Sequence, residues 1–276
     1  MDVICATAGH VIQTLPGGKP VQGVTSLDNL LYVLRGNLSS EQIEVYDKDI
    51  YRLQRKLTVP RLGFPADITA CGHNRCAYIS DGDSRGVHRV ALPDAAVKYW
   101  LVGDIPFGLS VTDSHSVLVT CIEVRKIKEF STDGRLLRQL ELPIDVSPPR
   151  HTVQLSREQF VVCHGGYSGL VGLHRVCLVG SDAQVIKSFG RFPGSGNQQL
   201  DQPGHLAVDR HKCVFVADYC NGRVLLLSPS LTYIREIVSR RQLNGNPTRL
   251  YLDEDNSRLY VAVDGSGGRR VVVVSV

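Results

Sequence analysis

The sequence predicts an all-β protein, a closed propeller of six four-stranded antiparallel blades. Three observations favour this fold. Short apolar runs of strand length alternate with turn-forming residues, groups of these runs recur every 41 to 44 residues with one longer interval of 54, and the last group has one strand too few. We therefore expect all 276 residues to form one propeller domain.

The repeating units follow one another along the whole chain. The first continues through LLYVL, QIEVYD and RLQRKL, the second starts with FPADITAC, and the third contains SVLVTC, KIKEFS and LLRQLEL. The fourth contains QFVVCHG, LHRVCLV and QVIKSFG, and the fifth has the clearest strands, HLAVD, CVFVAD, RVLLLS and YIREIV. These patterns predict blades at residues 21–60, 64–103, 105–143, 149–190, 202–239 and 246–276.

The sixth unit predicts how the ring closes. NPTRLYLDEDNSRLYVAVDGSGGRRVVVVSV holds only three strands, whereas an apolar run at residues 10–15, HVIQTL, precedes the first unit. Isolated blades would expose strand edges, and radial closure protects them. We expect residues 10–15 to complete the sixth blade.

One position of the repeat is predicted to face the central funnel. It lies two residues after the proline that opens each unit, although Val21 replaces that proline in the first unit. The long interval contains an insertion at residues 191–202. The predicted funnel positions are Gly23, Asp67, Gly108, His151, His205 and Arg249.

The fifth unit resembles the NHL repeat. PGHLAVDRHKCVFVADYCNGRVLLLSP carries Asp209, Asp218, Asn221 and Arg223 where the family's pattern has them. The sixth unit matches in part through Asp253, Asp264 and Arg270, and the second keeps Asp81 and Arg85. The resemblance implies a six-bladed propeller, in which the motif Asp, Asn and Arg mainly stabilise the loop between the second and third strands. It also implies a role like the recruiting propeller of tripartite-motif ubiquitin ligases, which binds RNA or protein, or that of a copper- or zinc-dependent peptide-amidating lyase.

The loops that enter the inner strands and join the second strands to the third are expected on one binding face. Arg85, Arg125, Tyr167, Tyr219 and Arg249 are its candidate partner-binding residues. The basic residues expected there are Arg35, Arg61, Arg85, Arg125, Lys126, Arg150, Arg223, Arg249, Arg269 and Arg270. The acidic residues expected there are Glu41, Asp81, Asp83, Glu123, Asp218 and Asp264.

These residue types leave three functions open. A non-enzymatic module that binds a protein or peptide is favoured, because the sequence contains no complete catalytic constellation and the acidic residues offset the basic ones. RNA binding is the alternative, since arginines and aromatic side chains suit phosphates and bases. A metal-dependent lyase or hydrolase is the second alternative, with His151 and His205 as weak candidate ligands near Asp67 and Arg249. No cofactor is expected.

The composition is that of an ordinary globular protein. Hydrophobic residues make up 43% and charged residues 21%, and the formal charge of +4 is small for a nucleic-acid-binding domain. No apolar run approaches the roughly 20 residues that span a bilayer, and the N-terminus lacks the pattern of a secretory signal. We expect a monomeric cytoplasmic domain without membrane contact.

Overall fold

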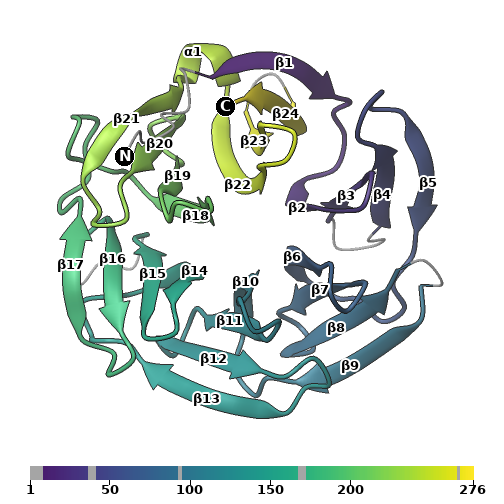
Figure 1. The fold of residues 1–276 in the computed structure, drawn as a ribbon, viewed down its shortest axis with the longest axis horizontal. Coiled ribbons are helices and arrows are strands. Elements are labelled where there is room, and N and C mark those ends of the chain that lie inside the picture. The colour runs from purple at the N-terminus through teal and green to yellow at the C-terminus, as the bar shows by residue number, and fades with distance from the viewer. Residues whose placement is uncertain (1–8, 37–41, 93–94, 167–171, 266–267) are drawn as a thin grey trace.

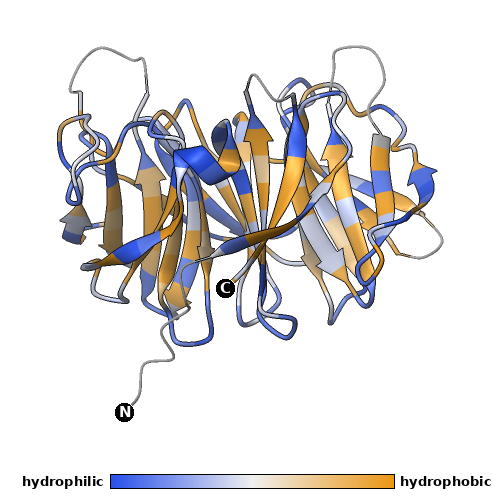
Figure 2. Ribbon diagram, turned by 90° about the horizontal axis from the view of Figure 1, so that it is seen from above, coloured by the Kyte–Doolittle hydropathy of each residue, from blue (hydrophilic) through white to orange (hydrophobic). Residues whose placement is uncertain are grey.

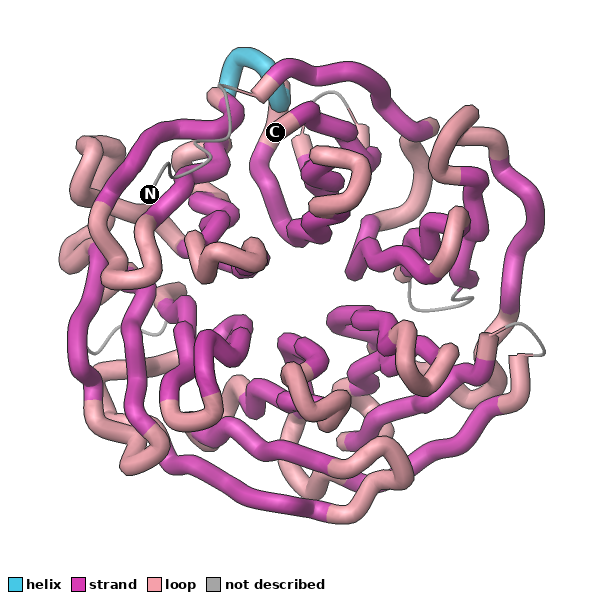
Figure 3. The backbone as a smooth tube through the Cα atoms, viewed as in Figure 1, coloured by secondary structure: helices cyan, strands magenta, loops and turns pink. Residues whose placement is uncertain are grey.

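The computed structural model shows six four-stranded antiparallel sheets arranged as a closed ring around a central axis (Figure 1). It describes residues 9–36, 42–92, 95–166, 172–265 and 268–276. Strands joined by tight turns account for nearly all of the ring (Figure 3). The predicted fold class, a six-bladed β-propeller closed by an N-terminal strand, is confirmed.

In the first three blades the strands run in chain order from the axis outward. Blade 1 consists of β2 (Val21–Leu27), β3 (Leu30–Arg35), β4 (Gln42–Asp47) and β5 (Leu53–Leu57). Blade 2 consists of β6 (Pro65–Cys71), β7 (Cys76–Asp81), β8 (Gly86–Ala91) and β9 (Val97–Leu101). Blade 3 consists of β10 (Pro106–Val111), β11 (Val117–Cys121), β12 (Lys126–Phe130) and β13 (Leu136–Glu141).

Blades 4 and 5 follow the same order, and blade 6 takes its outer strand from the N-terminal region. Blade 4 consists of β14 (Pro149–Ser156), β15 (Gln159–His164), β16 (Arg175–Gly180) and β17 (Val185–Phe189). Blade 5 consists of β18 (Pro203–Val208), β19 (Val214–Asp218), β20 (Arg223–Leu227) and β21 (Tyr233–Val238). Blade 6 consists of β22 (Asn246–Asp253), β23 (Arg258–Asp264), β24 (Arg270–Ser275) and β1 (His10–Leu15).

The closure of the ring depends on β1 and a short helix. β1 pairs antiparallel with β24, from His10 opposite Ser275 to Leu15 opposite Val271. The helix α1 (Arg240–Leu243) begins with a capping box, and its Gln242 side chain donates to the Gly9 carbonyl oxygen at 2.9 Å. A single helical turn thus holds the start of the closing strand, which the sequence pattern did not predict.

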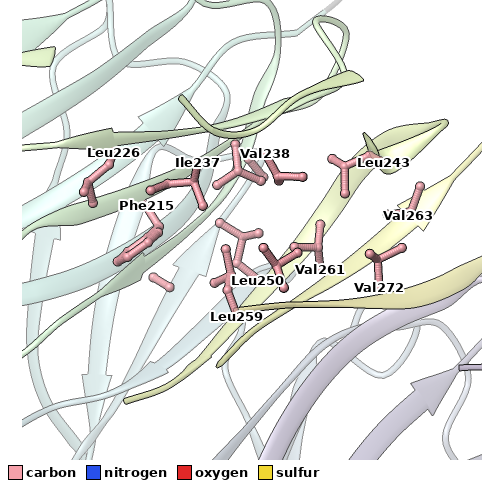
Figure 4. Packing of buried hydrophobic residues seen from close by; sticks show 14 of the residues in the cluster. Phe215, Leu226, Ile237, Val238, Leu243, Leu250, Leu259, Val261, Val263 and Val272 are labelled. Carbon is pink, nitrogen blue, oxygen red and sulfur yellow. The ribbon is translucent and has the colours of Figure 1, made fainter. Parts of the chain in front are cut away.

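The hydrophobic core is divided among the six interfaces between neighbouring blades. Each of six buried clusters draws its residues from two adjacent blades. Figure 4 shows the cluster between blades 5 and 6, where Phe215 and Leu226 face Leu250 and Leu259. In side view the strands are mainly apolar and many of the connecting turns are hydrophilic (Figure 2). Because each blade packs on both faces, the ring holds its inner strands in fixed positions around the axis.

No helix within the described ranges is long and apolar enough to cross a lipid bilayer.

Candidate functional site

A β-bulge at the start of every inner strand defines the mouth of the funnel. In all six blades the pairing of the first two strands skips one residue, which follows the leading proline or Val21. A bulge leaves its extra residue outside the ladder and turns its side chain away from the sheet. The skipped residues are Gln22, Ala66, Phe107, Arg150, Gly204 and Thr248.

These six residues line two adjoining cavities that we call the Arg150 cavity and the Phe64 cavity. The Arg150 cavity has a volume of about 270 Å³ and is lined by Phe107, Arg150, Gln202, Gly204, Tyr219, Thr248 and Arg249. The Phe64 cavity has a volume of about 350 Å³ and shares Phe107, Thr248 and Arg249 with it. Its other lining residues are Pro20, Val21, Gln22, Phe64, Ala66, Val263, Asp264 and Arg269. Together the two cavities form the funnel mouth, to which all six blades contribute.

Phe107 stands between two arginines where the cavities meet. The guanidinium carbon of Arg249 lies 5.1 Å from the centre of the Phe107 ring, and that of Arg150 lies 5.5 Å from it. Both distances are within the range of cation–π attraction. The mouth therefore presents an aromatic ring flanked by positive charge.

The floor of the funnel is a buried polar cluster formed by the next residue of four inner strands. Asp67, His151, His205 and Arg249 are between 1% and 8% exposed. Asp67 Oδ2 lies 3.3 Å from His205 Nε2 and 3.7 Å from His151 Nε2, and Asp67 Oδ1 lies 3.7 Å from Arg249 Nε. The two imidazole rings stack with their centres 3.7 Å apart. The structure thus brings together all four polar side chains predicted at the funnel.

Hydrogen bonds from this cluster connect blades across the axis. Asp67 accepts from the backbone N–H groups of Ile68 and Leu109, each at 2.9 Å. Arg249 donates through Nε and Nη2 to the Ala66 carbonyl oxygen, at 3.2 and 2.5 Å. Since Leu109 belongs to blade 3 and Arg249 to blade 6, Asp67 and its neighbours hold three inner strands in position.

The backbone partners determine the protonation of the two histidines. The Leu250 N–H donates to His205 Nδ1 at 3.3 Å, so His205 Nε2 carries the proton and donates to Asp67. His151 Nε2 lies 2.9 Å from the Leu109 carbonyl oxygen, which can only accept, so this nitrogen also carries a proton. His151 Nδ1 is buried and has no hydrogen-bond partner among the described residues.

Burial decides which groups of the floor are charged. Burial lowers the pKa of His151 to about 3. The neighbouring His205 also lowers this pKa, and Asp67 raises it by a smaller amount. Burial also lowers the pKa of His205, against the raising effect of Asp67. Burial alone would raise the pKa of Asp67, but His205, Arg249 and His151 together bring it below its usual value. At neutral pH the floor therefore contains one carboxylate, one guanidinium and two neutral imidazoles.

The same cluster is the group of potential metal ligands in the described part of the chain. Asp67, His151 and His205 each offer a ligand atom, and these atoms lie within 4.8 Å of one another. However, both nitrogens that face Asp67 act as hydrogen-bond donors. A metal at His205 Nε2 would move the ring proton to Nδ1, opposite the Leu250 N–H, and would bring a cation close to Arg249. The residues thus fit a structural polar cluster better than a metal site.

Two funnel positions are glycines because neighbouring strands approach too closely there for a side chain. A β-carbon at Gly23 would lie 2.7 Å from the Ile68 nitrogen, and one at Gly108 would lie 2.5 Å from the Arg150 carbonyl oxygen. These contacts are with backbone atoms, which cannot rotate away. The glycines that interrupt the predicted polar ring allow adjacent blades to close around the funnel.

Replacing Gly108 with alanine is expected to lower the free energy of unfolding by about 1–3 kcal/mol, because the inner strands must separate. Gly18→Ala is the matched control, since a β-carbon there meets no atom within 4 Å. The control should change the stability by less than about 0.5 kcal/mol. Urea denaturation of both variants measures the difference, and equal stability would show that the close approach is unimportant.

The motif residues of blade 5 hold the long insertion in place. Arg223 Nε donates to Asp218 at 2.8 Å, and the Arg223 side chain also donates to the carbonyl oxygens of Ser195, Gly196 and Gln199. In blade 2, Asp81 pairs with His88 at 3.2 Å instead of with Arg85. In blade 6, Asp264 pairs with Arg269 at 3.3 Å instead of with Arg270. The polar pair is retained with different residues.

The candidate partner-binding residues do not all meet. Arg249 and Tyr219 line the Arg150 cavity. Arg85 and Arg125 occupy equivalent turn positions with φ of 52° and line neither of the two mouth cavities. Tyr167 lies outside the described residues. Only part of the predicted set therefore belongs to the funnel mouth.

Much of the positive charge predicted for this face is compensated. Five of its ten basic residues form ion pairs with carboxylates, namely Arg35, Arg125, Arg223, Arg249 and Arg269. Arg270 donates instead to the carbonyl oxygens of Leu243, Asn244 and Gly268. A continuous basic track along the loops is thus not formed by these six residues.

Sequence reasoning missed Phe107, Gln22, Gln202, Thr248 and Phe64 as residues of the mouth. Three of them occupy the position directly after the leading proline or its replacement, which was available as a signal in the repeat alignment. What the repeat alone could not show is the bulge. Without it, strand alternation would place this residue on the side opposite to its neighbour at the funnel position.

Comparisons with known proteins support the fold. No protein-family model matches the chain, and no curated protein matches it. Among solved structures, it is similar to virginiamycin B lyase from Staphylococcus aureus, with 11% identity and a TM-score of 0.65 over 97% of this chain and 99% of that one. It is also similar to hydrazine synthase from Kuenenia stuttgartiensis, with 14% identity and a TM-score of 0.65 over 100% and 99% of the two chains.

A third similar structure is a chain of a nidogen/laminin complex, with 15% identity and a TM-score of 0.60 over 80% of this chain and 81% of that one. The neighbours thus include two named as enzymes and one named as part of a protein complex. At these identities the likeness extends to the fold alone, and this chain is a six-bladed β-propeller.

Proposed function

We propose that this chain is a non-enzymatic interaction module that binds a protein or peptide at the funnel mouth. The observation that carries the proposal is the set of six bulges, because each points a different residue type at the same opening. A rigid ring that presents variable side chains at a concave site is suited to recognition. The nidogen/laminin neighbour supports the proposal as a propeller found in a protein complex.

We also propose that the propeller is of the NHL type. Asp218, Asn221 and Arg223 support this assignment, since they make the contacts expected of loop-stabilising motif residues. Asn221 and Arg223 both donate to Asp218 at 2.8 Å. In this proposal the motif supports the frame, and partner recognition belongs to the bulge residues.

The funnel floor supports a binding function over metal-dependent catalysis. Its two imidazoles donate to a carbonyl oxygen and to a carboxylate, and neither offers a lone pair toward Asp67. The cluster is buried below the mouth and connects inner strands through backbone groups. Elemental analysis of the chain purified without added metal checks this directly, and stoichiometric zinc or copper lost in His151→Gln would contradict the proposal.

Random linear peptides displayed on phage and selected against the immobilised chain test the binding function. Peptides selected on the wild type should bind Phe107→Ala about tenfold or more weakly, because Phe107 is the aromatic centre of the mouth. Ile50→Ala is the matched control, since this exposed apolar residue follows β4 at the opposite end of blade 1. Equal loss in both variants, or a selection that enriches no peptide, would contradict the proposal.

A further inference from the structure

The two halves of the funnel mouth differ in charge. The described residues that line the Arg150 cavity include two arginines, Arg150 and Arg249, and no carboxylate. The Phe64 cavity contains one carboxylate, Asp264, which forms an ion pair with Arg269. Positive charge in the mouth is therefore concentrated on the side of blades 4 and 6, around Phe107.

The floor beneath does not cancel this charge. Asp67 is 1% exposed, and its two oxygens already accept from Ile68, Leu109 and His205. Its charge is balanced by Arg249, and both histidines are neutral at pH 7 because burial lowers their pKa. The floor is electrically neutral as a unit, and the cavity above it contains the guanidinium of Arg150, whose Nε donates to the Gly165 carbonyl oxygen at 3.4 Å.

The geometry of the arginines suits a carboxylate. A guanidinium group has five N–H donors in one plane, and Arg249 uses three of its nitrogens on the carbonyl oxygens of Ala66 and Thr248. This holds the side chain in place, as stacking on Phe107 does for both arginines. Prearranged guanidinium groups bind carboxylates with little loss of conformational freedom.

The Phe64 cavity adds apolar side chains next to this charge. Phe64 is 47% exposed, and Val21, Ala66 and Val263 line the same cavity. An exposed aromatic ring beside small apolar side chains gains free energy when a ligand covers it. Because the two cavities share Phe107, one ligand can reach both.

We infer that the funnel mouth binds a peptide carboxylate next to an apolar side chain, with the carboxylate in the Arg150 cavity and the apolar group in the Phe64 cavity. The inference rests on the proposed binding function and specifies its ligand. The carboxylate can come from an aspartate, a glutamate or the C-terminus of a partner. All three present the same pair of oxygens to the arginines.

The observations favour a peptide over RNA. A single-stranded nucleic acid needs basic residues spaced along a groove, with a phosphate contact for each nucleotide. Here Arg35, Arg125 and Arg223 are paired with carboxylates, and Arg85 and Arg125 line neither mouth cavity. A cationic cavity beside one that contains an exposed phenylalanine fits a carboxylate and an adjacent apolar side chain of one peptide.

The phage selection described above also tests this inference. The selected peptides should be enriched in an acidic residue or a free C-terminus adjacent to an apolar residue. Synthetic copies with Glu→Gln, Asp→Asn or a C-terminal amide should bind about tenfold or more weakly in fluorescence anisotropy, since a charge-assisted contact is lost. The three changes separate the side-chain and C-terminal sources.

Arg150→Glu is the matched change in the protein. An unchanged circular dichroism spectrum would show that the variant folds. The folded variant should bind the acidic peptides more weakly than the wild type does, and should bind their Glu→Lys counterparts more tightly. This exchange of preference distinguishes a contact with the ligand from a structural effect. The peptide amide and Gln forms test the inference on the wild type even if the variant is unstable.

Each other outcome overturns the inference. Selected peptides that lack acidic residues, or that tolerate the loss of the carboxylate, would refute it and leave the proposed binding function standing. Failure to select any peptide would refute both. Displacement of the peptides by a single-stranded oligouridylate that binds more tightly would refute it in favour of RNA.

Discussion

Replacing Asp67 with alanine is expected to lower the free energy of unfolding by about 3–5 kcal/mol, the usual cost of removing one partner from a buried ion pair. Arg249, which is 8% exposed, would lose the carboxylate 3.7 Å away. The N–H groups of Ile68 and Leu109 and the Nε2–H of His205 would lose their acceptor. The two backbone N–H groups and His205 Nε2 are too deeply placed for water to replace the lost contacts fully.

Urea denaturation followed by the fluorescence of Trp100, the single tryptophan, measures this change. Asp28→Ala is the control, because Asp28 also pairs with an arginine, Arg75, at 2.7 Å, but both side chains are more than half exposed. An exposed pair of this kind contributes about 0–1 kcal/mol. If Asp67→Ala cost no more than the control, the funnel floor would not connect the blades, and the case for a binding role over catalysis would weaken.

The repeat allowed the fold to be predicted from the sequence. Six units were recognisable, and the strand missing from the sixth unit could be supplied by the apolar run that precedes the first. In blade 5 the motif also predicts a contact, because Asp218 and Arg223 are close in the sequence and lie opposite each other in adjacent strands. In blade 2 the arginine predicted to fill this role, Arg85, is exposed in a turn and His88 takes its place. A histidine three residues further along the chain reaches the same carboxylate, which a fixed motif spacing cannot show.

The site was predictable in its floor and much less so in its mouth. Alignment of the units placed Asp67, His151, His205 and Arg249 at one level, and radial symmetry brings equivalent positions together. Their contacts, such as that between Asp67 and His205 from blades 2 and 5, depend on the width of the funnel. The mouth depends on six bulges, and a bulge is a choice between two backbone registers that the sequence of a single strand does not reveal.

The stability of the chain is expected to fall as the pH is lowered from about 6.5, because several histidines are buried in neutral form. Burial lowers the pKa of His151 and of His164 to about 3, and it also lowers that of His205. In the unfolded chain the pKa of histidine is about 6.5. Between these values the unfolded state binds more protons, so the free energy of unfolding falls with falling pH, by up to about 1.4 kcal/mol per pH unit for each histidine.

The carboxyl groups set the window in which this effect can be isolated. Asp67 and Glu44, whose pKa values are lowered, add to the loss only below about pH 4, where the unfolded chain takes up their protons. Asp209 and Asp218, whose pKa is raised by burial, work in the opposite direction. Urea denaturation between pH 6.5 and 5 therefore isolates the contribution of one histidine as the difference in slope between its variant and the wild type.

His164→Gln should reduce this pH dependence by up to about 1.4 kcal/mol per pH unit, since glutamine does not titrate and its side-chain oxygen can still accept from Arg175. His164 lies outside the funnel floor, so the variant leaves the cluster around Asp67 intact. His10→Gln is the matched control, because His10 is exposed on β1 and meets water in both states. An unchanged dependence of the free energy of unfolding on pH in His164→Gln would mean that the propeller opens locally and lets water protonate His164 without global unfolding. The propeller would then be less rigid than a fixed binding mouth requires.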